Sequence, residues 1–471
     1  MALNAAGIFR LRVGGNVANG AGFDSTVSGA GTDYSQQDAA QASASLGTST
    51  NSTTFTDVSA LFTSAMVGNY LKISSGAGAT VKIYRIDAFT NSSTITLDQV
   101  SGTYTAAVWK IGGAARLPEN IGTYVVAGNI VYILGSAGNA SSYPTSSLDY
   151  STTGYFTPTA GTVAAGRVRW LKDPAGPIPT IGSNGLMIYN FVGQEFSGLY
   201  FTASSNASNA SGILFCASSA AMTSILTDSI VNTNNQALLV GITWGGGCVK
   251  NNEIYGGTTT PTASSGADLV VLSSYSCEVV GNTIRYGRGI GIKQGNNQFG
   301  SIHDNQIYGC VGNGIEIGEA TSAYIVTVAG NVIDANGGHG ISITGTGGVS
   351  NVSIRNNNIT NHTGSGKSGI SVTNGTTALN DIRKGFIDYN NVYGNTTNYA
   401  NISAGAHDIS VDPGYTGSGN YAAGTAIKAK GFPALMPLSV TTNYKDIGME
   451  RQEAGGTSRP SHAINPPPVI G

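Results

Sequence analysis

The sequence predicts an all-β solenoid, in which short strands joined by tight bends form coils that stack on one another. Three observations predict it: a hexapeptide with apolar ends recurs, a second short apolar strand follows most copies, and no stretch shows the apolar period of a helix. The hexapeptides are "ILTDSI" (225–230), "VKNNEI" (249–254), "VVGNTI" (279–284), "IHDNQI" (302–307), "VAGNVI" (328–333), "IRNNNI" (354–359) and "IDYNNV" (387–392). Their spacing of about 27 residues is loose, so each coil carries a loop of variable length.

Each position of the hexapeptide meets a physical requirement. Positions one and six are apolar and β-branched in every copy, as expected for strand residues that face a core. Position three is mainly Gly, Asn or Asp, which tolerate positive φ, and therefore predicts a bend between two strands. In this alignment Thr227 takes position three of the first copy and Asp228 takes position four.

Position four predicts a column of buried asparagines. A buried Asn needs hydrogen-bond partners for both ends of its amide. Because paired strands lie about 4.8 Å apart, each amide can bond the next amide and the backbone of the bend. We therefore expect a structural asparagine ladder, whose members are Asn252, Asn282, Asn305, Asn331, Asn357 and Asn390.

The second strand of most coils is a short apolar tetrapeptide. Its copies are "GIGI" (289–292), "GIEI" (314–317), "GISI" (340–343) and "GISV" (369–372). Since successive strand residues point to opposite faces, the Ile and Val residues are expected to point inward. Glu316, which stands between two isoleucines, is expected to point outward.

These two motifs resemble the rungs of the right-handed parallel β-helix, the pectate-lyase-like superfamily. The resemblance is strong over roughly 120–410, and it implies about ten coils. The Gly-rich piece "GNVANGAGFDSTVSGAGTDYSQQDAAQ" (15–41) resembles the opening of β-helix proteins found in bacteriophage and environmental viral sequences. Near the other end, "KDIGMERQE" (445–453) looks like the closing segment common in the superfamily.

We divide the chain into four parts. Residues 1–45 form a Gly/Ser-rich N-terminal arm, and residues 46–114 form a small β domain with alternating strands and turn signals. Residues 115–410 form the right-handed parallel β-helix. Residues 411–471 form closing strands and a Pro-rich tail. The arm is expected to order only against a neighbouring copy or another protein, because alone it buries too little apolar surface.

Composition limits the classes of partner. Only 10% of the residues are charged, the net charge is −2, and the chain has 67 glycines. Without a basic patch or an acidic tract, no nucleic-acid partner is expected. The N-terminus does not read as a signal peptide, and no apolar run approaches the length of a membrane span, so no membrane contact is expected.

The four cysteines have more than one interpretation. Cys216, Cys248, Cys277 and Cys310 fit small buried residues on neighbouring coils, but a disulfide between Cys248 and Cys277 stays open. The chain has no CxxC motif and no paired His spacing, so we expect neither a metal site nor a cofactor.

Catalysis needs a separate test, because many proteins of the superfamily that this sequence resembles act on acidic polysaccharides. The resemblance implies a Gly-His-Gly element for polygalacturonase-type hydrolases, and Gly338-His339-Gly340 matches it. The accompanying Asn-Thr-Asp, Asp-Asp and Arg-Ile-Lys motifs are absent, and the outward columns hold no paired carboxylates. We therefore assign no catalytic residue, and the remaining candidates are Glu316, Glu319 and His339.

A group of charged residues on consecutive coils is the best candidate for a pocket. We expect it to be solvated surface charge, and we expect Asp304 beside His303 to serve the bend. The members of this group are Arg285, Arg288, Lys293, His303, Glu316 and Glu319.

Three functions remain open at this point. The favoured hypothesis is a non-enzymatic structural protein of a bacteriophage virion, such as a capsid decoration, spike or fibre component. It would assemble in the host cytoplasm and lie on the virion surface. Its partners would be other virion proteins and neighbouring copies, including a homo-oligomer such as a trimer, and a host-surface glycan. The alternatives are a polysaccharide depolymerase or lyase of tail-spike type, and a carbohydrate-binding adhesin without catalysis.

Overall fold

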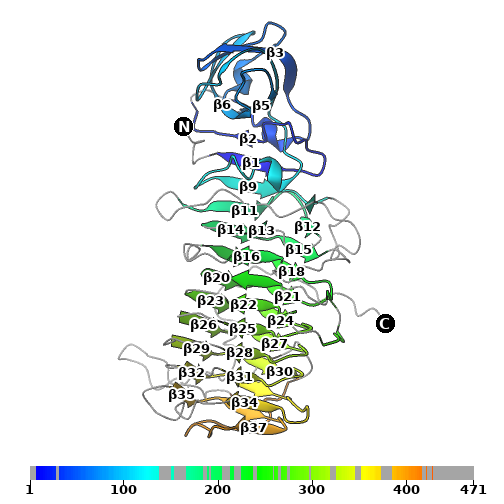
Figure 1. Cartoon of the computed structure of the whole chain (residues 1–471), viewed down its shortest axis with the longest axis vertical. Helices are drawn as coiled ribbons and strands as arrows, with labels where there is room; N and C mark the ends of the chain where they lie inside the picture. The colour runs from blue at the N-terminus through cyan, green and yellow to red at the C-terminus, as the bar shows by residue number, and fades with distance from the viewer. Residues whose placement is uncertain are drawn as a thin grey trace. The chain divides into compact units, whose positions relative to one another are not determined.

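The structure is all-β, as the sequence predicts (Figure 1). In the described part of the chain the only helical elements are three short 3₁₀ turns: η1 (Tyr34–Gln36), η2 (Ser64–Met66) and η3 (Pro118–Asn120). The computed structural model describes residues 7–27, 31–136, 150–152, 166–183, 188–189, 193–203, 213–216, 224–236, 241–257, 259–263, 267–272, 276–295, 299–318, 325–344, 352–372, 385–415, 421 and 427.

The chain forms two compact units. The first comprises Met1–Ser183, Met187–Tyr200 and Thr223–Ile225, and the second comprises Asn184–Leu186, Phe201–Met222 and Leu226–Gly471. The two are described separately below.

A closed barrel is the main element of the first unit. Its strands follow the order β3 (Ala42–Thr50), β4 (Thr54–Thr56), β7 (Thr94–Leu97), β6 (Lys82–Asn91), β5 (Tyr70–Ser75) and β8 (Thr103–Ile111). Alternating residues such as Ile95 and Leu97 fill its core, together with Phe55 and Trp109. The buried Asp57 accepts a hydrogen bond from Trp109 Nε1 at 2.9 Å and so fixes the loop after β4.

The N-terminal segment pairs within its own chain. Strand β1 (Ile8–Leu11) lies parallel to β9 (Ile130–Ile133), with Ile8 opposite Ile130, and β2 (Gly22–Phe23) covers the other edge of β1. Phe9 and Leu11 are fully buried. The expectation that residues 1–45 order only against another copy is therefore wrong for residues 8–11, because the alternation in "IFRL" buries two large apolar side chains.

Parallel strands follow the barrel in this unit. β9 pairs with β11 (Val168–Lys172), and β11 pairs with β14 (Gln194–Ser197). β10 (Tyr150–Thr152) pairs with β12 (Thr180–Ser183), and β13 (Ile188–Tyr189) completes the set.

The second unit is a parallel solenoid with three sheets, numbered here by their order within one coil. Sheet one contains β17 (Ile225–Thr227), β20 (Gly247–Lys250), β23 (Cys277–Val280), β26 (Phe299–His303), β29 (Ile325–Ala329), β32 (Val352–Arg355) and β35 (Gly385–Asp388). Sheet two contains β15 (Tyr200–Ala203), β18 (Ile230–Asn232), β21 (Glu253–Tyr255), β24 (Thr283–Arg285), β27 (Gln306–Tyr308), β30 (Val332–Asp334), β33 (Asn358–Thr360) and β36 (Asn391–Tyr393). Sheet three contains β16 (Leu214–Cys216), β19 (Ile242–Trp244), β22 (Val270–Leu272), β25 (Ile292–Gln294), β28 (Ile315–Ile317), β31 (Ile341–Ile343), β34 (Ser368–Val372) and β37 (Thr397–Ala400).

The bend between sheets one and two lies at the predicted position in six of the seven copies. Its residues have φ near +60°, and they are Asn251, Gly281, Asp304, Gly330, Asn356 and Tyr389. In the first copy, however, Asp228 rather than Thr227 has positive φ, at 49°. Ile230 accordingly pairs with Glu253, so our alignment of this copy was shifted by one residue. A β-branched Thr tolerates positive φ poorly, whereas Asp tolerates it well.

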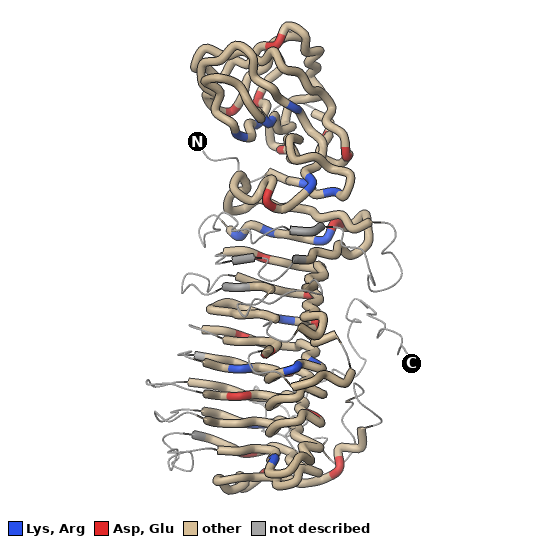
Figure 2. Tube along the Cα trace, turned by 45° about the vertical axis from the view of Figure 1, so that its right-hand side comes forward, with Lys and Arg blue, Asp and Glu red and all other residues tan. Residues whose placement is uncertain are grey.

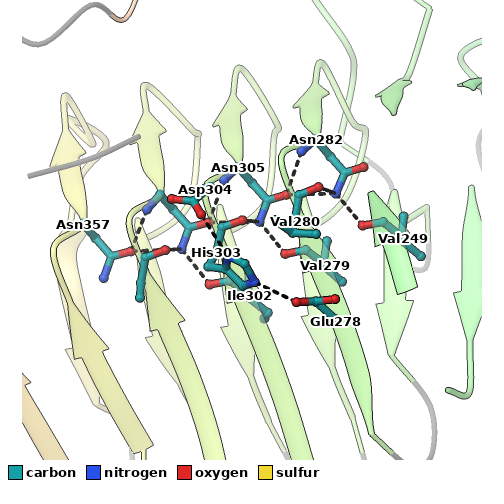
Figure 3. Close-up of polar contacts among 12 residues, drawn as sticks. Val249, Glu278, Val279, Val280, Asn282, Ile302, His303, Asp304, Asn305 and Asn357 are labelled. Carbon is teal, nitrogen blue, oxygen red and sulfur yellow. Dashed lines mark hydrogen bonds and ion pairs between the residues drawn. The ribbon is translucent and has the colours of Figure 1, made fainter. Parts of the chain in front are cut away.

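The six asparagines lie in one continuous column of hydrogen bonds, and Figure 3 shows its middle part with Asn282, Asn305 and Asn357. In the first five asparagines Nδ2 donates to the Oδ1 of the Asn in the next coil, and Asn331, for example, donates to Asn357 at 2.9 Å. The same Nδ2 donates to the carbonyl of Ile302 in the preceding coil at 2.9 Å. All six side chains are at most 2% exposed.

The column ends on a carboxylate. Nδ2 and the backbone N–H of Asn390 both donate to Oδ1 of Asp408, at 3.1 and 2.7 Å. Residues 405–411, called the closing segment below, also bond to β36, because Val392 N–H donates to the carbonyl of Ile409. From the sequence, residues 445–453 are expected to close this end of the β-helix, and they lie outside the described residues.

We expect Asn331→Leu to lower the melting temperature clearly. The substitution removes the Asn331 acceptor of the buried Asn305 backbone N–H and the Asn331 donor to the carbonyls of Ile302 and Ala329. Each such loss costs about 1–3 kcal/mol. Calorimetry of the full chain measures the effect.

The matched control is Gln306→Leu, which removes a half-buried amide from the outer face of the neighbouring coil. It should change the melting temperature little. Equal effects of the two substitutions would contradict a stabilising role for the column.

Candidate functional site

Three titratable side chains meet on the outer face of sheet one (Figure 3). His303 ends β26, Asp304 is the bend residue that follows it, and Glu278 lies on the neighbouring strand β23. Nδ1 of His303 lies 2.9 Å from Oδ2 of Asp304, and Nε2 lies 3.1 Å from Oε1 of Glu278. We call these residues the His303 cluster.

The two carboxylates favour the protonated imidazole. The hydrogen bond to Asp304, followed by that to Glu278, raises the pKa of His303 above its ordinary value despite partial burial. In turn, the hydrogen bond from His303 lowers the pKa of Glu278, aided by Cys248 and by the charge of Lys250. The side chains are 27%, 49% and 44% exposed for His303, Glu278 and Asp304, so solvent reaches all three.

This arrangement limits the chemistry. Both ring nitrogens of His303 are occupied by carboxylates, so the imidazolium has no free nitrogen to accept a proton from a substrate. A glycosidase acid must carry a raised pKa, whereas the pKa of Glu278 is lowered. The cluster is thus better suited to holding an ion pair than to general acid catalysis.

The sequence candidates do not come together as a site. Glu316 accepts a hydrogen bond from Asn313 Nδ2 at 2.8 Å, and it lies between Lys293 and Ser342 in the register of sheet three. His339 lies in a turn, where its Nδ1 accepts the backbone N–H of Ser368 at 3.0 Å. Burial, followed by the charge of Lys367, lowers the pKa of His339. Glu319 lies outside the described residues.

Arg285 and Arg288, the two arginines of the charged group predicted from the sequence, contact other residues instead. Arg285 forms an ion pair with Glu253 and stacks over the rings of Tyr255 and Tyr286, 4.7 and 5.2 Å from their centroids. Arg288 donates to the carbonyl of Asn235 at 2.9 Å.

A row of tyrosines covers sheet two, which the sequence analysis missed. Tyr286 and Tyr308 contact each other edge to face, with centroids 5.4 Å apart, and Tyr308 contacts Tyr421 at the same distance. Tyr415 packs on Tyr421, and Tyr421 donates a hydrogen bond to Asp334 at 3.1 Å. Tyr415 and Tyr421 therefore lie against the outer face of sheet two, and Tyr308 and Tyr421 are only 8% exposed.

Three described cysteines of the second unit lie in neighbouring coils. Among the described residues Cys248, Cys277 and Cys310 are not joined by a disulfide. Cys277 and Cys310 are buried, and Sγ of Cys277 lies 3.5 Å from the carbonyl of Trp244. The side chain of Cys216 lies outside the description.

Two features are absent from the described residues. No group of three or more His, Cys, Asp and Glu side chains is placed to hold a metal ion. No helix has the length and apolar character needed to span a membrane.

A family comparison covers much of the second unit. Residues 211–396 match the family described as "Right handed beta helix region". This part of the chain is a right-handed β-helix. No curated protein matches the sequence.

Solved structures to which this chain is similar include enzymes and a phage protein. The pectate lyase Pel9A is 12% identical with a TM-score of 0.39, over 72% of this chain and 91% of that chain. The catalytic unit of a GH87 α-1,3-glucanase from Streptomyces thermodiastaticus is 14% identical with a TM-score of 0.32, over 79% and 84%. The Gp54 tailspike of Acinetobacter baumannii bacteriophage AP22 is 12% identical with a TM-score of 0.22, over 76% and 64%. At these values the similarity carries no argument about this chain and transfers no activity.

The site residues that sequence reasoning missed were missed for two different reasons. Glu278 lies one residue before its hexapeptide, so the column comparison omitted it. The tyrosines had a weak signal, because Tyr255, Tyr308 and Tyr393 each follow position six of their copies.

We expect His303→Gln to destabilise the β-helix more in acid than in alkali. Since the folded pKa of His303 is raised, its stabilisation is complete below about pH 6.5 and is lost as the pH rises through the folded value. For a partly exposed pair the effect is on the order of 0.5–1 kcal/mol. Melting temperatures of both proteins at pH 5.5 and pH 9 test this, and a difference that grows with pH would contradict the ion pair.

Proposed function

We propose that this chain is a non-enzymatic structural component of a bacteriophage virion, a capsid decoration, spike or fibre, that presents the β-helix as a rod. One observation carries the non-enzymatic part: the carboxylates of the described coils are used in bonds within the chain. A depolymerase needs a pair of carboxylates free to act on a sugar and a water.

Every Asp or Glu that the structure describes between 166 and 415 accepts a hydrogen bond or an ion pair from the chain. These residues are Asp173, Glu195, Asp228, Glu253, Asp268, Glu278, Asp304, Glu316, Asp334, Asp388, Asp408 and Asp412. Figure 2 shows how sparsely charged residues are distributed on the coils. Such a surface suits a stiff element better than a site for acidic polysaccharides.

The barrel supplies a surface for attachment to the particle. Val58 and Leu61 are each 81% exposed on the loop after β4, and Leu46, at 49%, is tied to the same loop because its N–H donates to Asp57. Asp57 also accepts the N–H of Ser59, so the loop is held in place. Exposed aliphatic side chains on an ordered loop are typical of protein contacts.

The remaining parts of the proposal follow from a virion role. The chain assembles in the host cytoplasm and lies on the virion surface, where it contacts other virion proteins and neighbouring copies, as a trimer or another homo-oligomer. A host-surface glycan is a further partner of the rod. The N-terminal sequence 15–41, which resembles the opening of phage β-helix proteins, supports the virion assignment.

A polysaccharide depolymerase is the second candidate, and one observation favours it. Glu278 and Asp304 are two half-exposed carboxylates on either side of one imidazole. If the imidazole moved away, they would form a pair of free carboxylates.

We expect the purified protein to leave pectin, alginate and host capsule intact. Size-exclusion chromatography of each polymer after incubation measures chain length. Shortening that disappears in Glu278→Gln and Asp304→Asn would establish the second candidate instead. Shortening that persists in both variants would place an active site outside the His303 cluster.

We expect Val58→Ser with Leu61→Ser to abolish incorporation into particles while preserving the melting temperature. Both side chains are exposed, so their loss removes little from the barrel core. The control is Ile325→Ser, which removes a 50% exposed aliphatic residue from the β-helix and should leave occupancy unchanged. Normal occupancy of the double variant would place attachment elsewhere.

A further inference from the structure

A second column of hydrogen bonds runs through the bend between sheets two and three. The backbone N–H of Cys310 donates to Oδ1 of Asn336 at 3.0 Å, and Nδ2 of Asn336 faces Nε2 of His362 at 3.4 Å. Nδ1 of His362 lies 2.9 Å from Oδ1 of Asn395. We call these four residues the second column.

The partners of His362 require a neutral imidazole with its proton on Nδ1. Oδ1 of Asn395 accepts only, so Nδ1 must donate to it. Nδ2 of Asn336 donates only, so Nε2 must accept. The orientation of Asn336 is fixed, because its Oδ1 accepts from Cys310 and its Nδ2 also donates to the carbonyl of Ile307 at 3.2 Å.

The ring is enclosed. His362 is fully buried, and a Cβ built on Gly340 would lie 3.1 Å from its Cε1, so Gly340 leaves room for the ring and little else. The titratable groups that act on the ring are Asp334 and His339. Burial lowers the pKa of His362 to about 4.

Both columns end in the closing segment. Nδ2 of Asn395 donates to Oδ1 of Asn398 at 3.2 Å, and Nδ2 of Asn398 donates to Oγ of Ser410 at 3.0 Å. The asparagine ladder ends two residues earlier, on Asp408. The closing segment is therefore held at adjacent positions by the two columns.

We propose that the second column is an acid-sensitive lock on the last coils: protonation of His362 breaks its bond to Asn336 and releases the closing segment. The added proton lies on Nε2, where it meets the donor Nδ2 of Asn336. Turning the Asn336 amide over replaces this conflict with two others. Nδ2 would then face the Cys310 N–H, and Oδ1 would face the Ile307 carbonyl.

The release is local because the conflict lies downstream of most coils. His362 precedes β34 and β37, and Asn395 lies between β36 and β37. Coils from β20 to β27 keep the asparagine ladder, which contains no titratable group from Asn252 to Asn390. Acid should therefore open the last coils and the closing segment first.

The sign follows from the neutral requirement. In the unfolded chain His362 takes up a proton near pH 6.5, whereas in the folded chain it does so near pH 4. The stabilisation is present above pH 6.5 and is lost as the pH falls through this window. The equilibrium constant for local opening should rise up to about tenfold per pH unit between those values.

Hydrogen exchange of the full chain at pH 7 and pH 4.5, corrected for intrinsic rates, tests the proposal. Amides of 391–411 should lose protection by tenfold or more, while amides of 279–307 should not. The variant His362→Asn, which matches the asparagines of both columns and cannot titrate, should keep protection at pH 4.5. The control His303→Gln should retain the wild-type loss in 391–411.

Three results would overturn the lock. One is a uniform loss of protection over all coils in the wild-type protein. Another is an equal loss in wild type and His362→Asn. The third is unchanged protection of 391–411 at pH 4.5. If His362→Asn does not fold, the wild-type exchange pattern still decides between local and uniform opening.

Discussion

The β-helix depends on the hydrogen bonds at one bend in each coil. A residue of positive φ follows the strand of sheet one, and the ladder Asn stands between it and the first residue of sheet two. Backbone groups at such a bend are buried and cannot all join a sheet. Asn331 supplies partners for the carbonyls of Ile302 and Ala329, while its own N–H is accepted by Asn357. A single amide thus satisfies several groups, each of which would cost about 1–3 kcal/mol if left unpaired.

This requirement explains what the sequence could predict. The bend, the amide and the inward β-branched residues recur because every coil needs the same hydrogen-bond partners at its bend and the same apolar residues in its core. The repeated hexapeptide was therefore enough to predict the fold. The first copy was misaligned because Asp228 suits both the amide position and the bend, and Ser229 fills the amide position instead. The N-terminal arm was predicted not to order within its own chain because its composition is Gly-rich. Its segment 8–11 nevertheless forms a strand in which Phe9 and Leu11 are buried.

The sites were less predictable, because their contacts join distant parts of the chain. Tyr421 reaches Asp334 and Tyr308, which no local pattern could indicate. The second column was missed for another reason: Cys310, Asn336, His362 and Asn395 are chemically different residues that meet one geometric demand. Histidine there satisfies the column only when neutral, whereas asparagine satisfies it at any pH. The asparagines from Asn252 to Asn390 therefore tolerate acid, and the second column does not.

The direction of the ladder determines how the β-helix must end. Every Nδ2 donates toward the next coil, so the last Asn of the column always has a donor that needs an acceptor beyond it. The column must end on an acceptor, and an ionised carboxylate accepts at both oxygens without donating. Asp408 meets this demand: Oδ1 accepts both donors of Asn390, while Oδ2 accepts the hydroxyl of Tyr399 and the N–H of Gly405. An asparagine at 408 could not serve both groups of donors, since one of its two ends would meet donors with a donor. The terminal residue of the ladder is thus constrained more tightly than any member within it, although it lies outside the repeat.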